Sequence, residues 1–400
     1  DASGMYANDT KHTEGSITNV ESYIKDILIG VGVETPEQTA TTVVDAKANG
    51  LKYSETTQIT DASDDTMWIP GGFGIASDSA TDIDDGVVIT DGTNEFVWIP
   101  VNDTDLAEMY STTTPEAALD TNLAQSTLGE AVTTTKIYSK LRVRSGDSYT
   151  AGAPGSTNAR EPDILTSTEA GDASTTANYG INLIKSELGY TGTSEQILKD
   201  FAQDMVDEYL DVFESIKEYD GFYIGRYELT GTAKNPTVQR HQPVLTAANT
   251  SANSWYGLKD ACNRVVTGED KDAQSYMIYG NQWDEVMDWL VDTQGKTDYE
   301  VNTDSSTWGN YSNSSGAAAV EGAGELQDSG HSDAWSANNI YDLAGNYRDW
   351  IQEADNTSYR VLRGGIYYGS GSNHPASDRD GYYPYNTGSD YSSRVALYIK

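Results

Sequence analysis

The chain has 400 residues, of which 37% are hydrophobic, so it can bury a core as one large domain with insertions or as two domains. Its formal net charge of −37 argues against nucleic acid and anionic membranes as partners, because both would be repelled. The same acidity favours oxygen-rich cation sites, although most of the carboxylates are expected simply to be solvated. The single cysteine, Cys262, excludes an internal disulfide and a cysteine-based metal site.

Residues 1–60 are expected to form a helical and linker segment. Apolar residues recur at helical spacing over 16–28, and a second, weaker helix is predicted over 36–49 with Gly50 as its stop. No apolar run approaches the ~20 residues needed to cross a bilayer, so no direct membrane span is predicted. Because the chain starts at Asp1 without a signal peptide, we expect it to have been processed, with an upstream anchor removed.

From Met67 onward the sequence alternates between short strands, helices and loops. Strands are predicted at 67–75, 85–90 and 95–101, followed by long surface excursions over 103–200 that include a strand near 136–144. Helices are predicted at 194–217, 253–265 and 281–293. Further strands are predicted at 221–230, 339–350, 360–365 and 393–400, and Gly- and Ser-rich loops at 302–338.

Six of these segments, in this order, carry a resemblance to a known family. They read EFVWIPV (95–101), GFYIGRYELT (221–230), NQWDEVMDWL (281–290), NIYDLAGNYRDW (339–350), RVLRGG (360–365) and SRVALYIK (393–400). Together they resemble the formylglycine-generating-enzyme, or sulfatase-modifying-factor, family. The resemblance implies an α+β, C-type-lectin-like fold over 67–400, with long loops and an insertion at about 103–200, preceded by the helical N-terminal segment.

The resemblance also bears on metal and on catalysis. Family members bind structural calcium near the motif LAGNYRDW, which places Asn346 and Asp349 as the candidate ligands, although Arg348 departs from the usual pattern. The oxidases of the family use a cysteine pair with copper, and others use three histidines. The segment 372–381 has no cysteine, and none of the four histidines, His12, His241, His331 and His374, is spaced as a ligand pair. We therefore expect a non-catalytic protein, and a formylglycine-generating-type oxidase is the less favoured alternative.

The segment 366–393 is the predicted ligand-binding surface. It consists almost entirely of Tyr, Ser, Gly, Asn and Asp, the residues typical of adaptable binding surfaces, between two ordinary strand sequences. Buried, such a segment would leave many hydroxyls and carboxylates unpaired, so its polar residues are expected to cluster on one solvent-facing surface. The candidates are Tyr367, Tyr368, Asn373, Asp378, Asp380, Tyr382, Tyr383, Tyr385, Asn386, Asp390 and Tyr391.

This arrangement is similar to the variable proteins of diversity-generating retroelements, whose variable region lies at the C-terminus of a lectin fold. A fixed member of the same fold with a tyrosine-rich loop is the other interpretation. Both predict a secreted or cell-surface protein, bacterial or viral, that binds a protein or glycan at a cell surface. A pilin-like or filament-forming subunit that assembles through residues 1–60 is the alternative function.

Overall fold

The computed structural model describes residues 40–50, 52–110, 161–162, 164–165, 168–169, 171, 179–250, 254–268, 270–355 and 358–400, together with the backbone of 143–145 and 148–150. The chain divides into two units, Asp1–Ala40 and Thr41–Lys400, and the second holds nearly all of the described residues. The helix predicted over 16–28, the start of the helix predicted over 36–49 and most of the insertion therefore lie outside the described residues.

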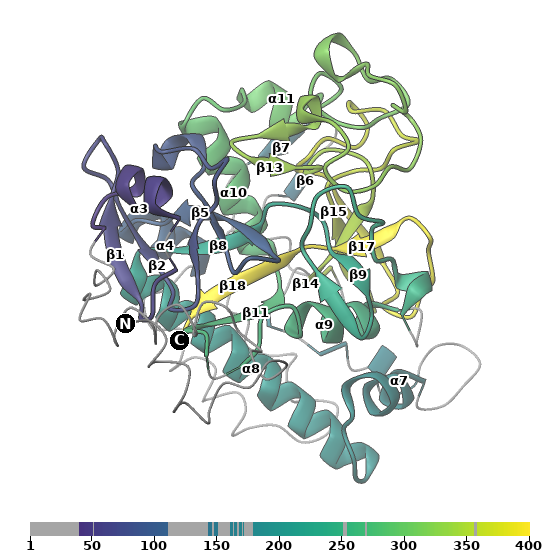
Figure 1. The fold of residues 1–400 in the computed structure, drawn as a ribbon. Coiled ribbons are helices and arrows are strands. Elements are labelled where there is room, and N and C mark those ends of the chain that lie inside the picture. The colour runs from purple at the N-terminus through teal and green to yellow at the C-terminus, as the bar shows by residue number, and fades with distance from the viewer. Residues whose placement is uncertain are drawn as a thin grey trace, which may run out of the picture. The chain divides into compact units, whose positions relative to one another are not determined.

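The described residues form a mixed α+β structure, as predicted (Figure 1). The α-helices among them are α3 (Val43–Asn49), α4 (Asp103–Tyr110), α7 (Tyr179–Leu188), α8 (Ser194–Tyr219), α9 (Trp255–Asn263), α10 (Gly280–Asp292) and α11 (Asp298–Asn302). One sheet has the strand order β11 (Ala273–Met277), β18 (Val395–Ile399), β8 (Gly221–Gly225), β5 (Glu95–Pro100), β4 (Val88–Thr90) and β3 (Gly74–Ile75).

A second sheet has the order β16 (Arg379–Tyr382), β15 (Arg360–Arg363), β14 (Arg348–Ala354) and β17 (Tyr391–Ser393). Four strand pairs complete the described structure: β1 (Thr57–Thr60) with β2 (Thr66–Ile69), β6 (Val143–Ser145) with β7 (Ser148–Thr150), β9 (Thr230–Thr232) with β10 (Asn235–Thr237), and β12 (Ser336–Ala337) with β13 (Ile340–Tyr341). The predicted strands 95–101 and 393–400 both reach the six-stranded sheet, where β5 and β18 flank β8.

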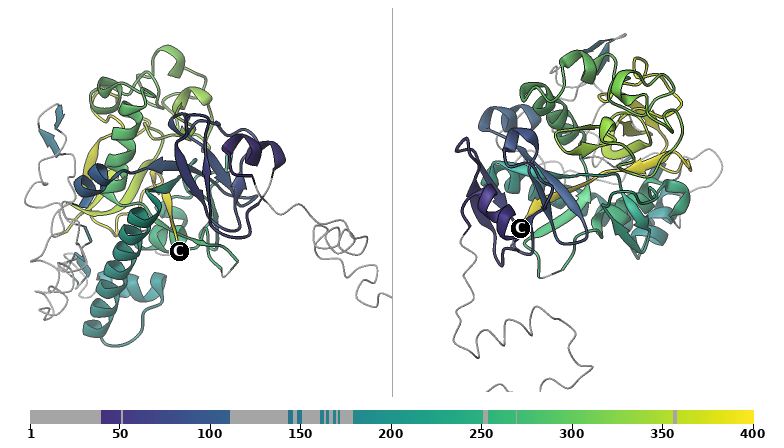
Figure 2. Two further views of the ribbon diagram at one scale, coloured as in Figure 1. Left: turned by 90° about the vertical axis from the view of Figure 1, so that its left-hand side faces the viewer. Right: turned by 45° about the horizontal axis from the view of Figure 1, so that its top comes forward.

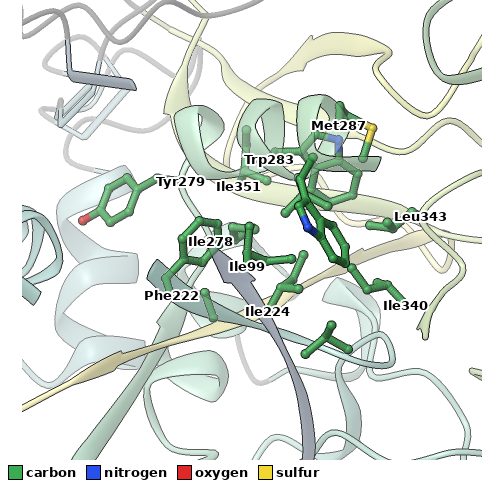
Figure 3. Packing of buried hydrophobic residues seen from close by; sticks show 14 of the residues in the cluster. Ile99, Phe222, Ile224, Ile278, Tyr279, Trp283, Met287, Ile340, Leu343 and Ile351 are labelled. Atoms are coloured by element: carbon green, nitrogen blue, oxygen red, sulfur yellow. The ribbon is translucent and has the colours of Figure 1, made fainter. Parts of the chain in front are cut away.

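The main core lies on one face of the six-stranded sheet. Because side chains alternate along a strand, Phe222 and Ile224 of β8 share a face with Ile99 of β5. Figure 3 shows these side chains packed with Trp283 and Met287 of α10. Helix α8, the long teal helix in Figure 2, contacts β8 and β18. It adds Val212, Phe213 and Ile216 to the same cluster. Strands from distant parts of the sequence are therefore held by one apolar layer.

The opposite face of this sheet is also covered. Tyr223 and Trp98 point to that face, where their rings meet edge to face with centroids 4.9 Å apart. The Tyr223 hydroxyl donates a hydrogen bond to the Trp68 carbonyl oxygen of β2 at 2.6 Å, which joins the β1–β2 hairpin to the sheet. Strands covered on both faces are expected to be continuously apolar, and β8 is buried at all five of its residues.

The helix ends follow the local sequence signals. Helix α3 ends at the predicted stop, since Gly50 adopts the left-handed conformation (φ 59°) and its N–H donates to the Lys47 carbonyl oxygen. Helix α8 begins after Thr193, whose side chain accepts a hydrogen bond from the Gln196 N–H. It ends at Asp220, which is also left-handed, with φ 56°.

One expectation needs correction. The interval 103–200 is not only surface excursion: α7 lies in it, and Glu161, Ile164, Leu165 and Glu169 are buried. Thr/Ser/Ala-rich composition hid these positions, because short apolar pairs carry little periodicity. The strands predicted around 339–350 are β13 and β14, and they are separated by a turn in which Asp342, Gly345 and Asn346 have positive φ. A Cβ on Gly345 would lie 2.0 Å from the Asn310 carbonyl oxygen, so this turn requires glycine.

Candidate functional site

The four-stranded sheet determines which side chains of the C-terminal segment share a surface. Arg348 of β14 lies opposite Tyr391 of β17. Asp380 of β16 lies opposite Leu362, which lies opposite Trp350, two residues from Arg348. Because paired residues and residues two apart point to the same face, Arg348, Asp380, Tyr382 and Tyr391 all project from one face of this sheet.

Arg348 is the centre of this face. Its side chain is only 8% exposed and donates a hydrogen bond to the Asp380 carboxylate at 2.7 Å. Its guanidinium carbon lies 5.8 Å from the centroid of the Tyr382 ring, within the range of a cation–π contact. The Tyr382 and Tyr391 rings lie 5.7 Å apart. One arginine on β14 thus organises an acid and two tyrosines that come from two other strands, β16 and β17.

Tyr367 and Tyr368 join the same group through the backbone. The Tyr367 N–H donates to the Asn346 carbonyl oxygen at 3.1 Å, and the Arg348 N–H donates to the Asp390 carbonyl oxygen at 3.0 Å. The two tyrosine rings meet edge to face at 5.1 Å, and Tyr368 is 57% exposed. We call Arg348, Tyr367, Tyr368, Tyr382 and Tyr391 the arginine-centred group.

Charge around this group acts on the tyrosine hydroxyls. Burial raises the pKa of Tyr368, with Arg348 lowering it and Asp390 raising it further. Burial, Tyr382 and Asp390 raise the pKa of Tyr391 to about 12. Tyr368 and Tyr391 are therefore neutral hydrogen-bonding groups at physiological pH.

A second tyrosine group uses Tyr383 and Tyr385. Their rings are stacked, with centroids 4.9 Å apart and planes 18° apart. Tyr359 meets Tyr383 edge to face at 4.5 Å, and Tyr179 of α7 meets Tyr385 at 5.2 Å. The sequence predicted one cluster, but the structure divides its tyrosines into two groups with different neighbours. Tyr382 and Tyr383 are adjacent in sequence, and adjacent side chains of an extended chain point in opposite directions.

The remaining predicted residues lie apart from both ring systems. Asn373 is exposed, and Asn386 is half-buried in a turn in which its N–H donates to the Tyr383 carbonyl oxygen at 2.9 Å. Asp378 is 5% exposed, and one of its carboxylate oxygens lies 2.7 Å from Nδ1 of His374. The prediction that Asp378 faces solvent is wrong, because this carboxylate has a local partner that permits its burial.

Sequence reasoning missed Arg348, Tyr359 and Tyr179 as members of the surface. Arg348 lies 32 residues before Asp380, and α7 lies farther still from Tyr385. The sequence contained one signal for Arg348. Arg348, Trp350 and Gln352 are two residues apart, so in a strand they lie on the same face of the sheet.

Asn346 and Asp349, the predicted calcium ligands, are both fully buried. The Asn346 side-chain oxygen accepts hydrogen bonds from the Asn310 amide at 3.0 Å and the Gln327 N–H at 3.1 Å. Asp349 Oδ2 accepts from Arg394 at 3.3 Å, while Asp349 Oδ1 has no hydrogen-bond partner. The Asn346 oxygen and Asp349 Oδ2 are thus already engaged in hydrogen bonds within the protein. Of the side-chain oxygens of these two residues, only Asp349 Oδ1 is free to coordinate a cation. No group of three or more His, Cys, Asp or Glu residues in the described part of the chain is placed to hold a metal ion.

Two more buried carboxylates surround this position. Glu228 accepts from the Asn346 amide at 2.8 Å, and Asp342 accepts from the Gly330 N–H at 2.7 Å. Burial raises the pKa of Asp342 to about 6, and burial likewise raises the pKa of Asp349 to about 6 although Arg394 lowers it. The cluster holds the turn between β13 and β14, and so the start of the strand that carries Arg348.

Cys262 is buried in α9, and burial raises the pKa of its thiol to about 12. Its Sγ lies 3.5 Å from the Ser393 hydroxyl. A thiol with so high a pKa is almost entirely protonated near neutral pH and is a poor nucleophile.

A separate pocket of about 630 Å³ is lined by the end of β5 and by parts of α4 and α10. Its acidic lining residues are Asp65, Asp84, Asp103, Asp105, Asp220, Glu285 and Asp292. None of the predicted ligand-binding residues lines this pocket, so it is a distinct feature of the molecule.

No family model matches the chain, and no curated protein matches it. Among solved structures, the chain is similar to Treponema denticola variable protein 1, with a TM-score of 0.26 and 15% identity over 44% of this chain and 84% of that one. No helix in the described ranges is both long and apolar enough to cross a membrane. The candidate site is therefore defined by its own geometry: an arginine-centred tyrosine group on a four-stranded sheet, with a second tyrosine group beside its edge strand.

Proposed function

We propose that this chain is a non-catalytic, extracellular ligand-binding protein with a C-type-lectin-like fold, and that segment 366–393 is its binding surface. The ligand class is a protein or glycan displayed at a cell surface. A single observation carries the proposal: ten of the eleven predicted residues remain exposed or half-buried, although the segment runs between two strands, β15 and β18, whose residues are almost all buried.

The tyrosines suit such a role because of how they are held. A tyrosine offers a large, stiff contact area at low entropic cost, and its hydroxyl adapts to either donors or acceptors. Tyr382 and Tyr391 are attached to strands, and Arg348 fixes Asp380 and Tyr382. Side chains that are ordered before binding lose less freedom on binding, which favours affinity.

Variation of the segment by a retroelement is the finer form of the proposal. The surface residues lie on loops and strand ends around the buried sheet, where substitutions between Tyr, Ser, Asn and Asp change few core contacts. An adjacent reverse-transcriptase gene and a near-copy of the DNA encoding 366–393 would support it, and their absence would favour a fixed tyrosine-rich surface.

The test of ligand binding replaces Tyr382, Tyr383 and Tyr385 together with alanine. Binders are first selected against the intact chain from a displayed peptide library and a glycan array. We expect the triple variant to lose these binders and to keep its far-ultraviolet circular dichroism spectrum. Tyr299→Ala is the matched control, because Tyr299 is 60% exposed and lies outside the segment. Selected binders that bind the triple variant unchanged would contradict the proposal.

A pilin-like or filament-forming subunit remains the alternative function. It places assembly in residues 1–60, most of which lie outside the described residues. Sedimentation velocity separates the two functions: a filament subunit shows a sedimentation coefficient that grows with concentration, whereas the binding protein stays at one size.

A further inference from the structure

The carboxylates beside the arginine-centred group outnumber its one guanidinium. Asp380 is paired with Arg348. Asp390 adjoins Tyr391, and its backbone carbonyl oxygen accepts a hydrogen bond from the Arg348 N–H at 3.0 Å. Asp390 also raises the pKa of Tyr368 and of Tyr391. No basic side chain of the described residues forms an ion pair with Asp390. The surface therefore presents the carboxylate of Asp390, without an ion-pair partner, beside the rings of Tyr368 and Tyr391.

The molecule itself shows what such a combination binds. Arg348 lies over the Tyr382 ring while donating to Asp380. Arg240 repeats the arrangement, with its guanidinium 4.9 Å from the Tyr341 ring centroid and an ion pair to Asp333. An aromatic face and a carboxylate together satisfy both the charge and the planar surface of a guanidinium.

From these contacts we propose that the arginine-centred group binds a cationic ligand, namely an arginine- or lysine-bearing segment of a protein partner. The cation stacks on the exposed ring of Tyr368 and pairs with Asp390, as Arg348 does with Tyr382 and Asp380. This inference rests on the proposed function and names the class of partner.

Long-range electrostatics acts in the same direction. A formal net charge of −37 attracts a basic partner and repels an acidic one, which speeds the encounter with the former. Attraction of this kind is screened as salt increases. Because overall charge alone attracts any cation, the test must separate the tyrosine surface from the rest of the acidic exterior.

The probe is a fluorescent peptide with four arginines separated by glycine and serine, compared with the same peptide carrying citrulline, a neutral isostere of arginine. Fluorescence anisotropy gives the affinity for the intact chain at low and at physiological salt. We expect the citrulline peptide to bind at least tenfold more weakly. Asp390→Asn and Tyr368→Ala should each weaken the arginine peptide by about two- to fivefold, the range for one exposed ion pair or cation–π contact.

Asp292→Asn is the matched control, because Asp292 is an exposed carboxylate that lines the separate acidic pocket. It removes the same charge from the chain and should leave the affinity unchanged. If Asp292→Asn weakens binding of the arginine peptide and Asp390→Asn does not, the cation binds in the pocket and the inference is overturned. Equal binding of the two peptides, or no binding of either, would overturn it as well.

The results that would contradict the proposed binding surface differ from those that would contradict the cationic partner. If the selected ligands depend on Tyr382, Tyr383 and Tyr385 but carry no basic residues and tolerate Asp390→Asn, the binding surface stands and the cationic partner is excluded. If the arginine peptide depends on Asp390 while no selected ligand depends on these tyrosines, the cation site stands without the wider surface. Equal melting temperatures for Asp390→Asn and the parent chain show that the fold is intact in each comparison.

Discussion

The buried ion pair between Glu169 and Arg360 offers the sharpest test of how the insertion joins the core. Both side chains are fully buried, and their charged atoms lie 3.3 Å apart. Glu169 also accepts a hydrogen bond from the Tyr256 hydroxyl at 3.0 Å. Arg360 donates to the Gln352 carbonyl oxygen at 2.8 Å and lies 4.3 Å from the Trp255 ring.

Glu169→Gln keeps the shape and an acceptor for Tyr256 but removes the charge that compensates Arg360. Removing one partner of a buried pair typically costs 3–5 kcal/mol of stability, because the other charge stays buried. Gln352 and Trp255 still contact Arg360 in the variant. We therefore expect its free energy of unfolding to fall by about 3 kcal/mol, the low end of this range. The exposed i,i+4 pair Glu195–Lys199 is the matched control, and Glu195→Gln should cost less than about 0.5 kcal/mol.

Urea denaturation measures both variants, with the midpoint shifting and the slope unchanged. Burial raises the pKa of Glu169 even though Arg360 lowers it, so the folded chain favours the protonated carboxyl. The stability that Glu169 contributes therefore falls as pH rises, and the cost of Glu169→Gln should be larger at low pH than at high pH. A cost below about 1 kcal/mol at pH 7, equal to that of Glu195→Gln, would refute the view that residues near 169 are part of the core.

Three further predictions concern the turn and the thiol. Folded Asp342 and Asp349 have pKa values of about 6 against an ordinary 3.8, so the folded chain holds protons that unfolding releases. The free energy of unfolding should thus fall as pH rises from about 4 to 6, and Asp342→Asn should reduce this fall in urea titrations. If calcium binds at Asn346 and Asp349, it raises the melting temperature at pH 7 relative to a chelator in the parent chain, but not in Asp349→Asn; equal values would exclude a structural ion. Iodoacetamide at pH 8 should leave Cys262 unmodified in the folded chain and alkylate it in urea, as mass spectrometry can check; rapid labelling of the folded chain would contradict its burial.

Much of the secondary structure could be predicted because its signals are local. The helix predicted at 194–217 is α8, with Thr193 and Asp220 at its ends, and the helix predicted at 281–293 is α10. The strand predicted at 95–101 is β5. Each has a strong apolar period or a capping residue within the segment itself, so tertiary contacts only had to select what the local sequence already favoured.

The insertion was poorly predicted for the opposite reason. Glu169 is buried because Arg360 and Tyr256, nearly two hundred and nearly ninety residues away, satisfy its carboxylate. A charged residue in a Thr- and Ala-rich stretch indicates a solvated loop unless its distant partner is known. Asp378 was misjudged in the same way, since His374 permits its burial.

For the candidate site, the sequence by itself determined the kind of surface, because a segment so rich in Tyr, Asn, Ser and Asp cannot be buried without unpaired polar groups. Only the tertiary structure decided how that surface is divided. Tyr382 ends β16 and contacts Tyr391, whereas the next residue, Tyr383, stacks on Tyr385. The parallel pairing of β14 with β17 brings Arg348 beside Tyr391. Strand register is a long-range property, so no local pattern could show that one arginine organises tyrosines from two neighbouring strands.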